Sequence, residues 1–300
     1  MRLEKKATVV STCVAGLLVL LKMSVGILSG SIAVLASAID SFLDLTVSLF
    51  NYFALNSAEK DPDDMFHYGR GKIEPLAAVI EGVVVSLSAL FILYEALVKF
   101  AHPRDMDHMS ESISVMIASF VITAFLVMFL NYVAKKTKNM VIKADALHYK
   151  TDLYSNGAVL VALVLINYTA KEWIDPILGI GIAIYMIYSA IPIIKEGILM
   201  LLDVALPQED IEKIITTIKS EALITDYHFL QTREAGSDIF VSVHTVFNLD
   251  ISLYDAHLVA DKIEEKIKNL FPDKSVHTII HMDPYDDSQI NEIEINTNKR

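Results

Sequence analysis

Long apolar stretches separated by short polar segments fill the first two thirds of the chain. Six of them approach the length of about 20 residues that a helix needs to cross a bilayer. They cover residues 7–28, 32–56, 76–100, 112–134, 145–168 and 175–200. Only Ser29-Gly30-Ser31 separates the first two, which predicts a helical hairpin. The pattern therefore predicts a domain of six transmembrane helices over residues 1–206.

The pattern changes after residue 206. Ile211, Ile214, Ile215 and Ile218 recur at helical spacing after Pro207, and residues 252–270 have the pattern of an amphipathic helix. Residues 227–234, 238–247 and 275–282 are typical of strands, and Gly236-Ser237 suits the turn between the first two. The order αββαβ predicts a small cytosolic α+β domain, ferredoxin- or metallochaperone-like, over residues 207–286. The polar residues 287–300 are predicted to form a disordered tail.

Composition supports a membrane protein and excludes two other classes. Hydrophobic residues make up 53% of the chain, and the mean hydropathy is +0.45. The net charge of -12 argues against a nucleic acid partner, which would require a basic surface. Because Cys13 is the single cysteine, an intrachain disulfide framework and a thiolate zinc cluster are both excluded.

Basic residues indicate the orientation of the six predicted spans. The segments on the side of the N-terminus contain Arg2, Lys5, Lys6, Lys60, Arg70, Lys72, Lys135, Lys136, Lys138 and Lys143. The segments on the other side contain little more than Arg104 and Lys171. The positive-inside rule then predicts that both termini are cytosolic.

Two pairs of ionisable residues interrupt the apolar segments. Asp40 and Asp44 lie four residues apart, as do His148 and Asp152, so each pair occupies one face of a helix. Such groups are costly inside a membrane and usually bind something. One nitrogen and three oxygen ligands suit Zn²⁺, and they tolerate Fe²⁺, Cd²⁺ or Co²⁺. Metal would displace protons from these ligands, which predicts metal/proton exchange.

Other intramembrane acids have less specific interpretations. Asp145, three residues before His148, is expected at the membrane interface. Glu81 is expected to face the helical bundle or to extend to the interface. A structural alternative also exists for the two pairs, namely hydrogen bonding between helices.

At these residues the chain resembles the cation diffusion facilitator family, and within it the bacterial YiiP/FieF type of zinc and ferrous-iron exporter. The segment Ser31-Ile-Ala-Val-Leu-Ala-Ser-Ala-Ile-Asp-Ser-Phe-Leu-Asp44 is similar to the family's signature in span two. The segment Lys143-Ala-Asp-Ala-Leu-His-Tyr-Lys-Thr-Asp152 is similar to its signature in span five. The resemblance implies a homodimer that works by alternating access. It also implies that the transport site consists of Asp40, Asp44, His148 and Asp152.

The loop after span two departs from the family pattern. In the bacterial relatives, two histidines in this loop bind a second metal together with an aspartate. Phe66 and Arg70 occupy the two histidine positions here, His67 is displaced by one residue, and Asp63 alone matches. A guanidinium stays protonated and is no metal ligand. We therefore expect the site of Asp63 and His67 to be weak or absent.

The resemblance also extends to the tail domain. His281 and Asp283 are two residues apart on a predicted strand, so they share one face. With His228 and His244 they resemble the family's paired-zinc site, and His257 resembles the residue that joins the metals to the dimer interface. Zinc there would be structural or regulatory. Lys72 and Asp203 match an inter-subunit charge pair of the family.

Together these features predict a homodimeric efflux transporter in the bacterial cytoplasmic (inner) membrane, surrounded by lipid, that exchanges Zn²⁺ or a similar cation for protons. A membrane-bound metal sensor or scaffold, whose tail binds metal without transport, is the alternative. An intramembrane metallohydrolase is a third class. The chain has no His-Glu-x-x-His motif, and all four predicted ligands are used on metal, so an enzyme is not expected.

Overall fold

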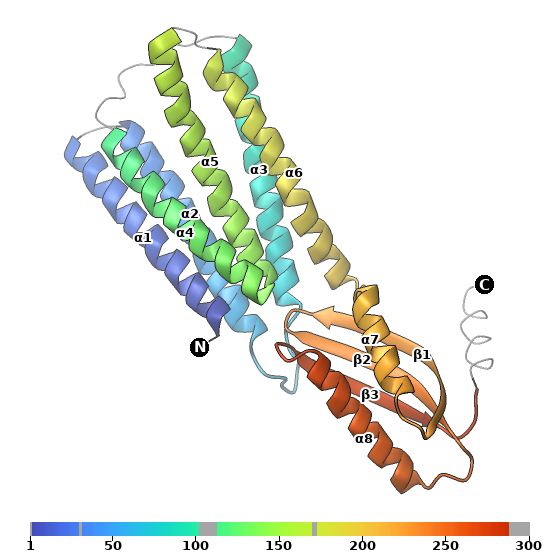
Figure 1. The fold of residues 1–300 in the computed structure, drawn as a ribbon. Helices are drawn as coiled ribbons and strands as arrows, with labels where there is room; N and C mark the ends of the chain where they lie inside the picture. The colour runs from blue at the N-terminus through green and yellow to red at the C-terminus, as the bar shows by residue number, and fades with distance from the viewer. Residues whose placement is uncertain (1, 30–31, 102–112, 170–172, 288–300) are drawn as a thin grey trace. The chain divides into compact units, whose positions relative to one another are not determined.

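A computed structural model describes residues 2–29, 32–101, 113–169 and 173–287. The chain divides into two compact units, Met1–Ile198 and Leu199–Arg300. The first unit is helical, and the second combines helices with a sheet (Figure 1). Each unit is described by itself below.

The helical unit contains six long helices that run alternately up and down (Figure 1). They are α1 (Leu3–Ser29), α2 (Ile32–Ala58), α3 (Ile73–Ala101), α4 (Ile113–Thr137), α5 (Met140–Thr169) and α6 (Ile174–Leu201). Among the described residues, five stretches are long and apolar enough to cross a membrane, one in each helix except α5. The first half of α5 carries Lys143, Asp145, Lys150 and Asp152, which lower its hydropathy.

Helix α5 belongs to two apolar cores. On one side, Ile142 and Tyr149 pack with Leu130 of α4 and Ala7 of α1. On another side, Leu147 packs with residues of α3 and α6. This double packing fixes the rotation of α5, and it therefore determines where the polar side chains of α5 lie.

Helices α3 and α6 approach each other closely at glycines. A Cβ on Gly82 would lie 2.7 Å from a carbon of Ile194, and one on Gly197 would lie 2.5 Å from a carbon of Val79. Small residues at such contacts are typical of helix pairs in membranes, because they let the backbones pack closely.

The second unit contains α7 (Gln208–Lys219), β1 (Ile224–Ala235), β2 (Asp238–Phe247), α8 (Leu253–Leu270) and β3 (Ser275–Asp283). The sheet order is β1-β2-β3, with β1 antiparallel and β3 parallel to β2. The turn between β1 and β2 includes Gly236 at φ 64, a conformation that favours glycine. The Ser252 hydroxyl caps α8 by accepting the Asp255 amide at 3.1 Å. The predicted order αββαβ is thus observed.

The two helices of this unit share one core with the sheet. Alternate residues of β2, among them Val241 and Val243, are buried against Ile214 and Ile218 of α7 and Ile263 of α8. Because side chains alternate along a strand, the residues between them lie on the opposite, open face. His244 is one of these, and this position matters for the site described below.

Candidate metal centres

A cluster of metal-ligating side chains lies between α2 and α5. Ligand atoms of Asp44, His148 and Asp152 all lie within 4.8 Å of one another. The His148 Nε2 atom is 3.2 Å from Asp44 Oδ1 and 3.4 Å from Asp152 Oδ2. All three side chains are at most one third exposed. We call these three residues the membrane cluster.

The neighbours of the membrane cluster hold its two helices together. The Tyr149 side chain is buried in the core of α1, α4 and α5, and its hydroxyl lies 2.7 Å from Ser48 Oγ of α2. This hydrogen bond joins α2 to α5 one turn along from Asp44. The rings of His148 and Tyr149 meet edge to face, with centroids 5.6 Å apart.

Asp40 does not join the membrane cluster. It lies one turn before Asp44 on α2 and is exposed at the surface of the unit. Its i, i+4 spacing from Asp44 places it on the neighbouring turn of the same face. The structure brings three of the four predicted ligands together, and the role of Asp40 stays a prediction.

Two further acids, one on α3 and one on α5, are buried in the helical unit. Glu81 and Asp145 are 2% and 0% exposed, and the Asn51 side chain contacts both of them. Both side chains are therefore enclosed by the helices, and the position of Asp145 at the membrane interface stays a prediction. Hydropathy alone could not reveal this arrangement, because it depends on how α2, α3 and α5 pack.

The loop between α2 and α3 holds Asp63 in a different set of contacts. Its carboxylate accepts the amides of Phe66 and Met65 at 2.9 and 3.0 Å and forms an ion pair with Arg70 at 2.5 Å. The Phe66 and Met65 amides and Arg70 together hold the pKa of Asp63 below its usual range. The His67 Nε2 atom lies 3.2 Å from the Asp64 carbonyl oxygen. These contacts agree with a weak or absent metal site, which stays a prediction.

A second cluster lies on the open face of the tail sheet. Ligand atoms of His228, His244, Asp283 and Asp287 all lie within 4.8 Å of one another. Asp283 is central, since its carboxylate lies 3.0 Å from His244 Nδ1, 3.6 Å from His228 Nε2 and 3.0 Å from His281 Nε2. We call His228, His244, Asp283 and Asp287 the tail cluster.

Strand register brings the tail histidines together. His228 of β1 pairs with His244 of β2, which in turn pairs with His281 of β3. A bulge lies just after His228, and Phe229 within it has φ 54, a strained conformation for a residue with a side chain. The His228 side chain is 12% exposed, and its Nε2 atom faces the carboxylates of Asp283 and Asp287, so it is oriented toward the centre of the tail cluster.

One residue joins the tail cluster without having been predicted as a ligand, and two predicted ligands lie outside the cluster, where their roles stay predictions. Asp287, expected to begin a disordered tail, lies 2.9 Å from His228 Nε2. His281 contacts Asp283 but is 63% exposed and outside the tail cluster. His257 on α8 is 64% exposed and lies 3.7 Å from Asp261. The spacing of Asp287, four residues after Asp283, gave no helix or strand signal that would have identified it as a ligand.

Asp203 contacts a residue of its own unit. Its Oδ1 atom lies 3.2 Å from Arg233 Nη1, and its backbone has φ 57. The guanidinium of Arg233 also lies over the Phe240 ring at 4.1 Å. The inter-subunit pair of Lys72 with Asp203 stays a prediction.

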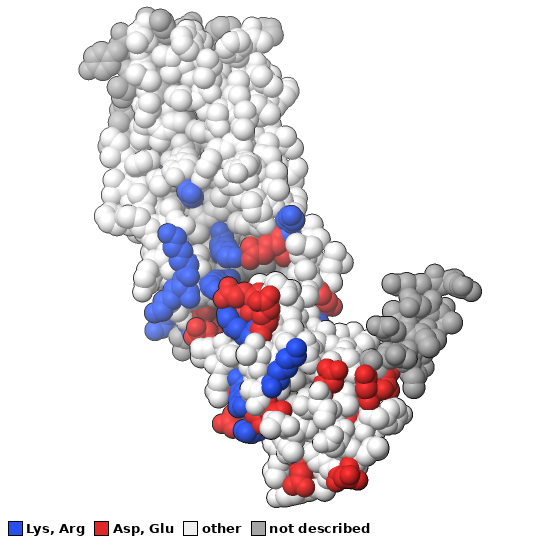
Figure 2. Space-filling model, turned by 45° about the vertical axis from the view of Figure 1, so that its right-hand side comes forward, with Lys and Arg blue, Asp and Glu red and all other residues white. Residues whose placement is uncertain are grey.

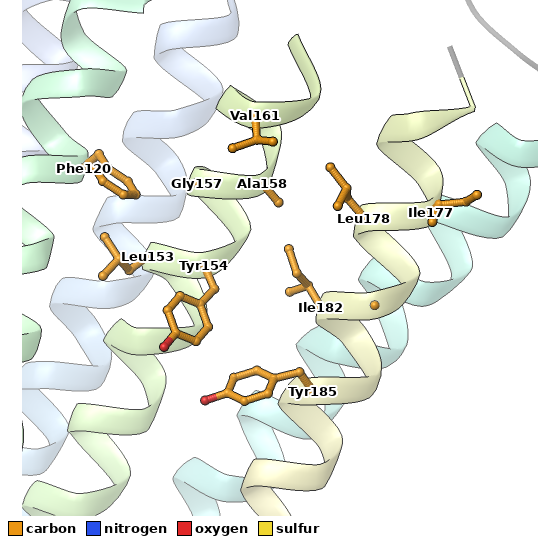
Figure 3. A pocket seen from close by; sticks show the side chains of 11 residues that line it. Phe120, Leu153, Tyr154, Gly157, Ala158, Val161, Ile177, Leu178, Ile182 and Tyr185 are labelled. Carbon is orange, nitrogen blue, oxygen red and sulfur yellow. The ribbon is translucent and has the colours of Figure 1, made fainter. Parts of the chain in front are cut away.

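An apolar pocket of about 510 Å³ lies between α4, α5 and α6. Phe120, Leu153, Val161 and Ile182 line it, together with the rings of Tyr154 and Tyr185 (Figure 3). None of the lining residues is acidic, histidine or cysteine, so this pocket offers no strong metal ligand. The polar chemistry of the helical unit lies elsewhere, in the membrane cluster and around Asn51.

The fold and the two clusters define a membrane protein that handles cations. The family model of the cation efflux transmembrane domain matches residues 8–202, and that of the cation efflux protein cytoplasmic domain matches residues 206–285. The chain therefore belongs to the cation efflux family, also called the cation diffusion facilitators, whose members are transporters rather than enzymes.

Curated relatives agree with this assignment over nearly the whole chain. The chain is 36% identical to the cation-efflux pump FieF of Citrobacter koseri and 35% identical to that of Escherichia fergusonii. Both alignments extend over 283 residues and cover 94% of this chain and 93% of the relative. A solved structure of CzrB is 29% identical over 27% of this chain and 99% of its own, at a TM-score of 0.25, too low to argue from.

Proposed function

We propose that this cation efflux protein exports a divalent transition-metal cation, Zn²⁺ first, across the bacterial cytoplasmic membrane in exchange for protons. The observation that carries the proposal is the membrane cluster of Asp44, His148 and Asp152. An imidazole and carboxylates together favour Zn²⁺, Fe²⁺, Cd²⁺ or Co²⁺ over Mg²⁺ and Ca²⁺, which prefer oxygen ligands alone. Asp40 would complete a tetrahedral site from the next turn of α2.

The proposed topology has six spans with both termini in the cytosol. Although α5 has low hydropathy, it is as long as its neighbours, and its polar half packs against α2, α3 and α4. On the face shown in Figure 2, much of the helical unit is free of charged side chains, and basic ones gather toward one end. That distribution supports the positive-inside orientation.

Exchange for protons follows from the chemistry of the ligands. A metal ion binds neutral imidazole and ionised carboxylate, so loading releases any protons that these groups carry. Conversely, protonation of His148 removes the lone pair of Nε2 and weakens the site. In an alternating-access cycle, metal would bind from the cytosol, and protons from the other side would release it.

The tail cluster is proposed to bind metal without transporting it. Three of its four ligands, His228, His244 and Asp283, come from strands whose register is held by backbone hydrogen bonds, which suits a permanent or sensing site. Metal there would reduce the repulsion between two acidic tails and so favour a homodimer.

Metal flux into proteoliposomes tests this function. The purified chain is reconstituted, a pH gradient is imposed, and uptake of Zn²⁺, Fe²⁺, Cd²⁺, Co²⁺ and Mg²⁺ is followed with internal dyes. Uptake should be fastest for Zn²⁺, negligible for Mg²⁺ and accompanied by counterflow of protons. Metal flux that is independent of the pH gradient would contradict the exchange mechanism.

A membrane-bound metal sensor is a second candidate, favoured by the tail cluster alone. A sensor would bind metal through His228, His244 and Asp283 and change conformation, but it would transport no metal. Tight binding to the reconstituted protein without flux of any metal in the panel would support the sensor and reject the transporter.

A further inference from the structure

A second polar site lies in the helical unit, distinct from the membrane cluster. Asn51 of α2, Glu81 of α3 and Asp145 of α5 are 0%, 2% and 0% exposed. The Asn51 Nδ2 atom donates to Glu81 Oε2 at 3.0 Å and to Asp145 Oδ1 at 3.3 Å. One amide therefore joins two buried carboxylates from two different helices.

Three oxygen atoms of this group have no hydrogen-bond partner. They are Asn51 Oδ1, Glu81 Oε1 and Asp145 Oδ2, and all are buried. Buried polar atoms nearly always have a hydrogen-bond partner or a bound ion. These three oxygens therefore require either a hydrogen-bond donor or a cation.

Protonation alone does not satisfy these atoms. A proton on Glu81 Oε1 would create a buried hydroxyl donor, yet that atom has no hydrogen-bond partner, and Asn51 Oδ1 would stay unsatisfied. A cation satisfies all of them, because it accepts lone pairs from several oxygens at once. The amide of Asn51 can also turn by 180°, which would direct Oδ1 between the carboxylates in place of Nδ2.

We propose that Asn51, Glu81 and Asp145 form an inner binding site for a divalent cation, with oxygen ligands only. Two carboxylates and an amide oxygen are the ligand types that hard divalent cations prefer, and transition metals accept them as well. With no nitrogen ligand, the inner site should discriminate between divalent cations less strongly than the membrane cluster does.

The inner site lies on the same helices as the membrane cluster. Asn51 follows Asp44 by seven residues on α2, and Asp145 precedes Asp152 by seven on α5. Seven residues are two helical turns, or about 10 Å along the axis, and they return to the same face. On both helices the displacement is toward the end where α2 finishes and α5 begins.

That end is the cytosolic end if the proposed topology holds, so a cation would meet the inner site before the membrane cluster. The order in which a transported cation meets the two sites rests on the proposed function, whereas the binding site itself does not. Equilibrium binding therefore tests the site without any transport.

The test measures binding of Mn²⁺, a divalent cation that prefers oxygen ligands, to the full chain in detergent. The background variant carries Asp44→Ala, Asp152→Ala and His244→Ala, which disable the membrane and tail clusters. It should still bind about one Mn²⁺ per protomer at the inner site. Adding Glu81→Gln or Asp145→Asn should weaken that binding by more than about tenfold, since even outer-shell partners contribute as much.

Glu74→Gln is the matched control. Glu74 lies seven residues before Glu81 on the same helix, is 6% exposed and accepts the Met140 amide at 2.9 Å. The Glu74→Gln substitution should leave Mn²⁺ binding to the background variant unchanged. Thermal unfolding with and without Mn²⁺ provides a second readout, because bound metal should raise the melting temperature of the background variant but not of the Glu81→Gln variant.

Equal Mn²⁺ binding with and without Glu81→Gln and Asp145→Asn would overturn the inner site. So would a background variant that binds no Mn²⁺ while remaining monodisperse and folded. Absence of metal flux through the wild-type protein, with Mn²⁺ binding at the inner site intact, would instead count against the proposed function, so the two failures are distinguishable.

Discussion

The membrane cluster and the tail cluster are built from different kinds of backbone. In the tail cluster, His228 and His244 are neighbours in strand register, and Asp283 lies on the adjoining strand. In the membrane cluster, Asp44 comes from one helix, and His148 and Asp152 come from another. Register is held by backbone hydrogen bonds, whereas the distance between two helices depends on contacts between their side chains.

This difference matches the two proposed roles. A site held by a sheet keeps its geometry, which suits permanent binding or sensing. A site shared by two helices is assembled or opened when the helices shift, as alternating access requires. The predictions below test that contrast, from the largest expected effect to the smallest.

Replacing His148 by Asp should change the metal preference of the membrane cluster. The site would then have oxygen ligands only, which favours Mn²⁺ over Zn²⁺. We expect the ratio of Zn²⁺ to Mn²⁺ flux in proteoliposomes to fall by more than about tenfold. The corresponding change in the tail, His244→Asp, should leave the flux ratio as it is, and an altered ratio there would contradict the division of roles.

Zinc should stabilise the tail through the tail cluster. At free Zn²⁺ about 100-fold above the dissociation constant, binding adds about 2.7 kcal/mol to the free energy of unfolding. Thermal unfolding of the full chain should show this gain in wild type and lose it with His244→Ala or Asp283→Ala. The control is His277→Ala, which removes a histidine on the same sheet that stacks on Phe240 outside the cluster.

Glu221 should make the stability of the tail depend on acid pH without involving metal. Its buried carboxylate accepts from Lys262 at 2.9 Å and from Lys266, and these two bonds lower its pKa. Because the folded-state pKa lies below the ordinary value of 4.5, the stabilisation is complete above pH 4.5 and is lost as the pH falls through the folded-state pKa.

Replacing Glu221 by Gln should cost about 1 kcal/mol at neutral pH, since both lysines are partly exposed and their charges are screened. In the variant, the stability of the tail should no longer decrease as the pH falls below 4.5. Hydrogen exchange of α7 and α8 measures this stability. The exposed Glu209→Gln serves as the control and should change neither quantity. An unaltered pH profile in Glu221→Gln would show that the ion pairs contribute nothing.

The loop should show the smallest effect. Arg70 and Asp63 form an exposed ion pair, and such pairs contribute little in water. We expect Arg70→Ala to change the flux of Zn²⁺ by less than about twofold. A larger loss in the same proteoliposome assay would mean that Arg70 acts in transport rather than in holding the loop.

The sequence predicted what periodicity and spacing determine. The tail strands and helices lie close to their predicted positions, because their apolar residues alternate or recur regularly. The i, i+4 spacing placed His148 and Asp152 on one face of α5. Placing Asp44 with them required one further inference, namely that the two ionisable pairs on separate helices bind the same metal ion. The structure does place Asp44 beside His148 and Asp152.

The rest depended on tertiary contacts that spacing does not encode. Asp145 lies beside Asn51 and Glu81 only because α2, α3 and α5 pack together. Asp287 follows the last strand, where no periodicity identifies a ligand. Asp40 has the expected spacing, yet its side chain is exposed and lies apart from the cluster, which spacing alone does not reveal.

Zinc flux through two variants, one with a substitution in the membrane cluster and one with a substitution in the tail cluster, tests the central claim most directly. Asp152→Ala and His244→Ala are reconstituted at equal density, and Zn²⁺ uptake driven by a pH gradient is compared with that of wild type. We predict that Asp152→Ala abolishes uptake while His244→Ala retains most of it. Uptake by Asp152→Ala at the wild-type rate would contradict the claim that the membrane cluster carries the cation across.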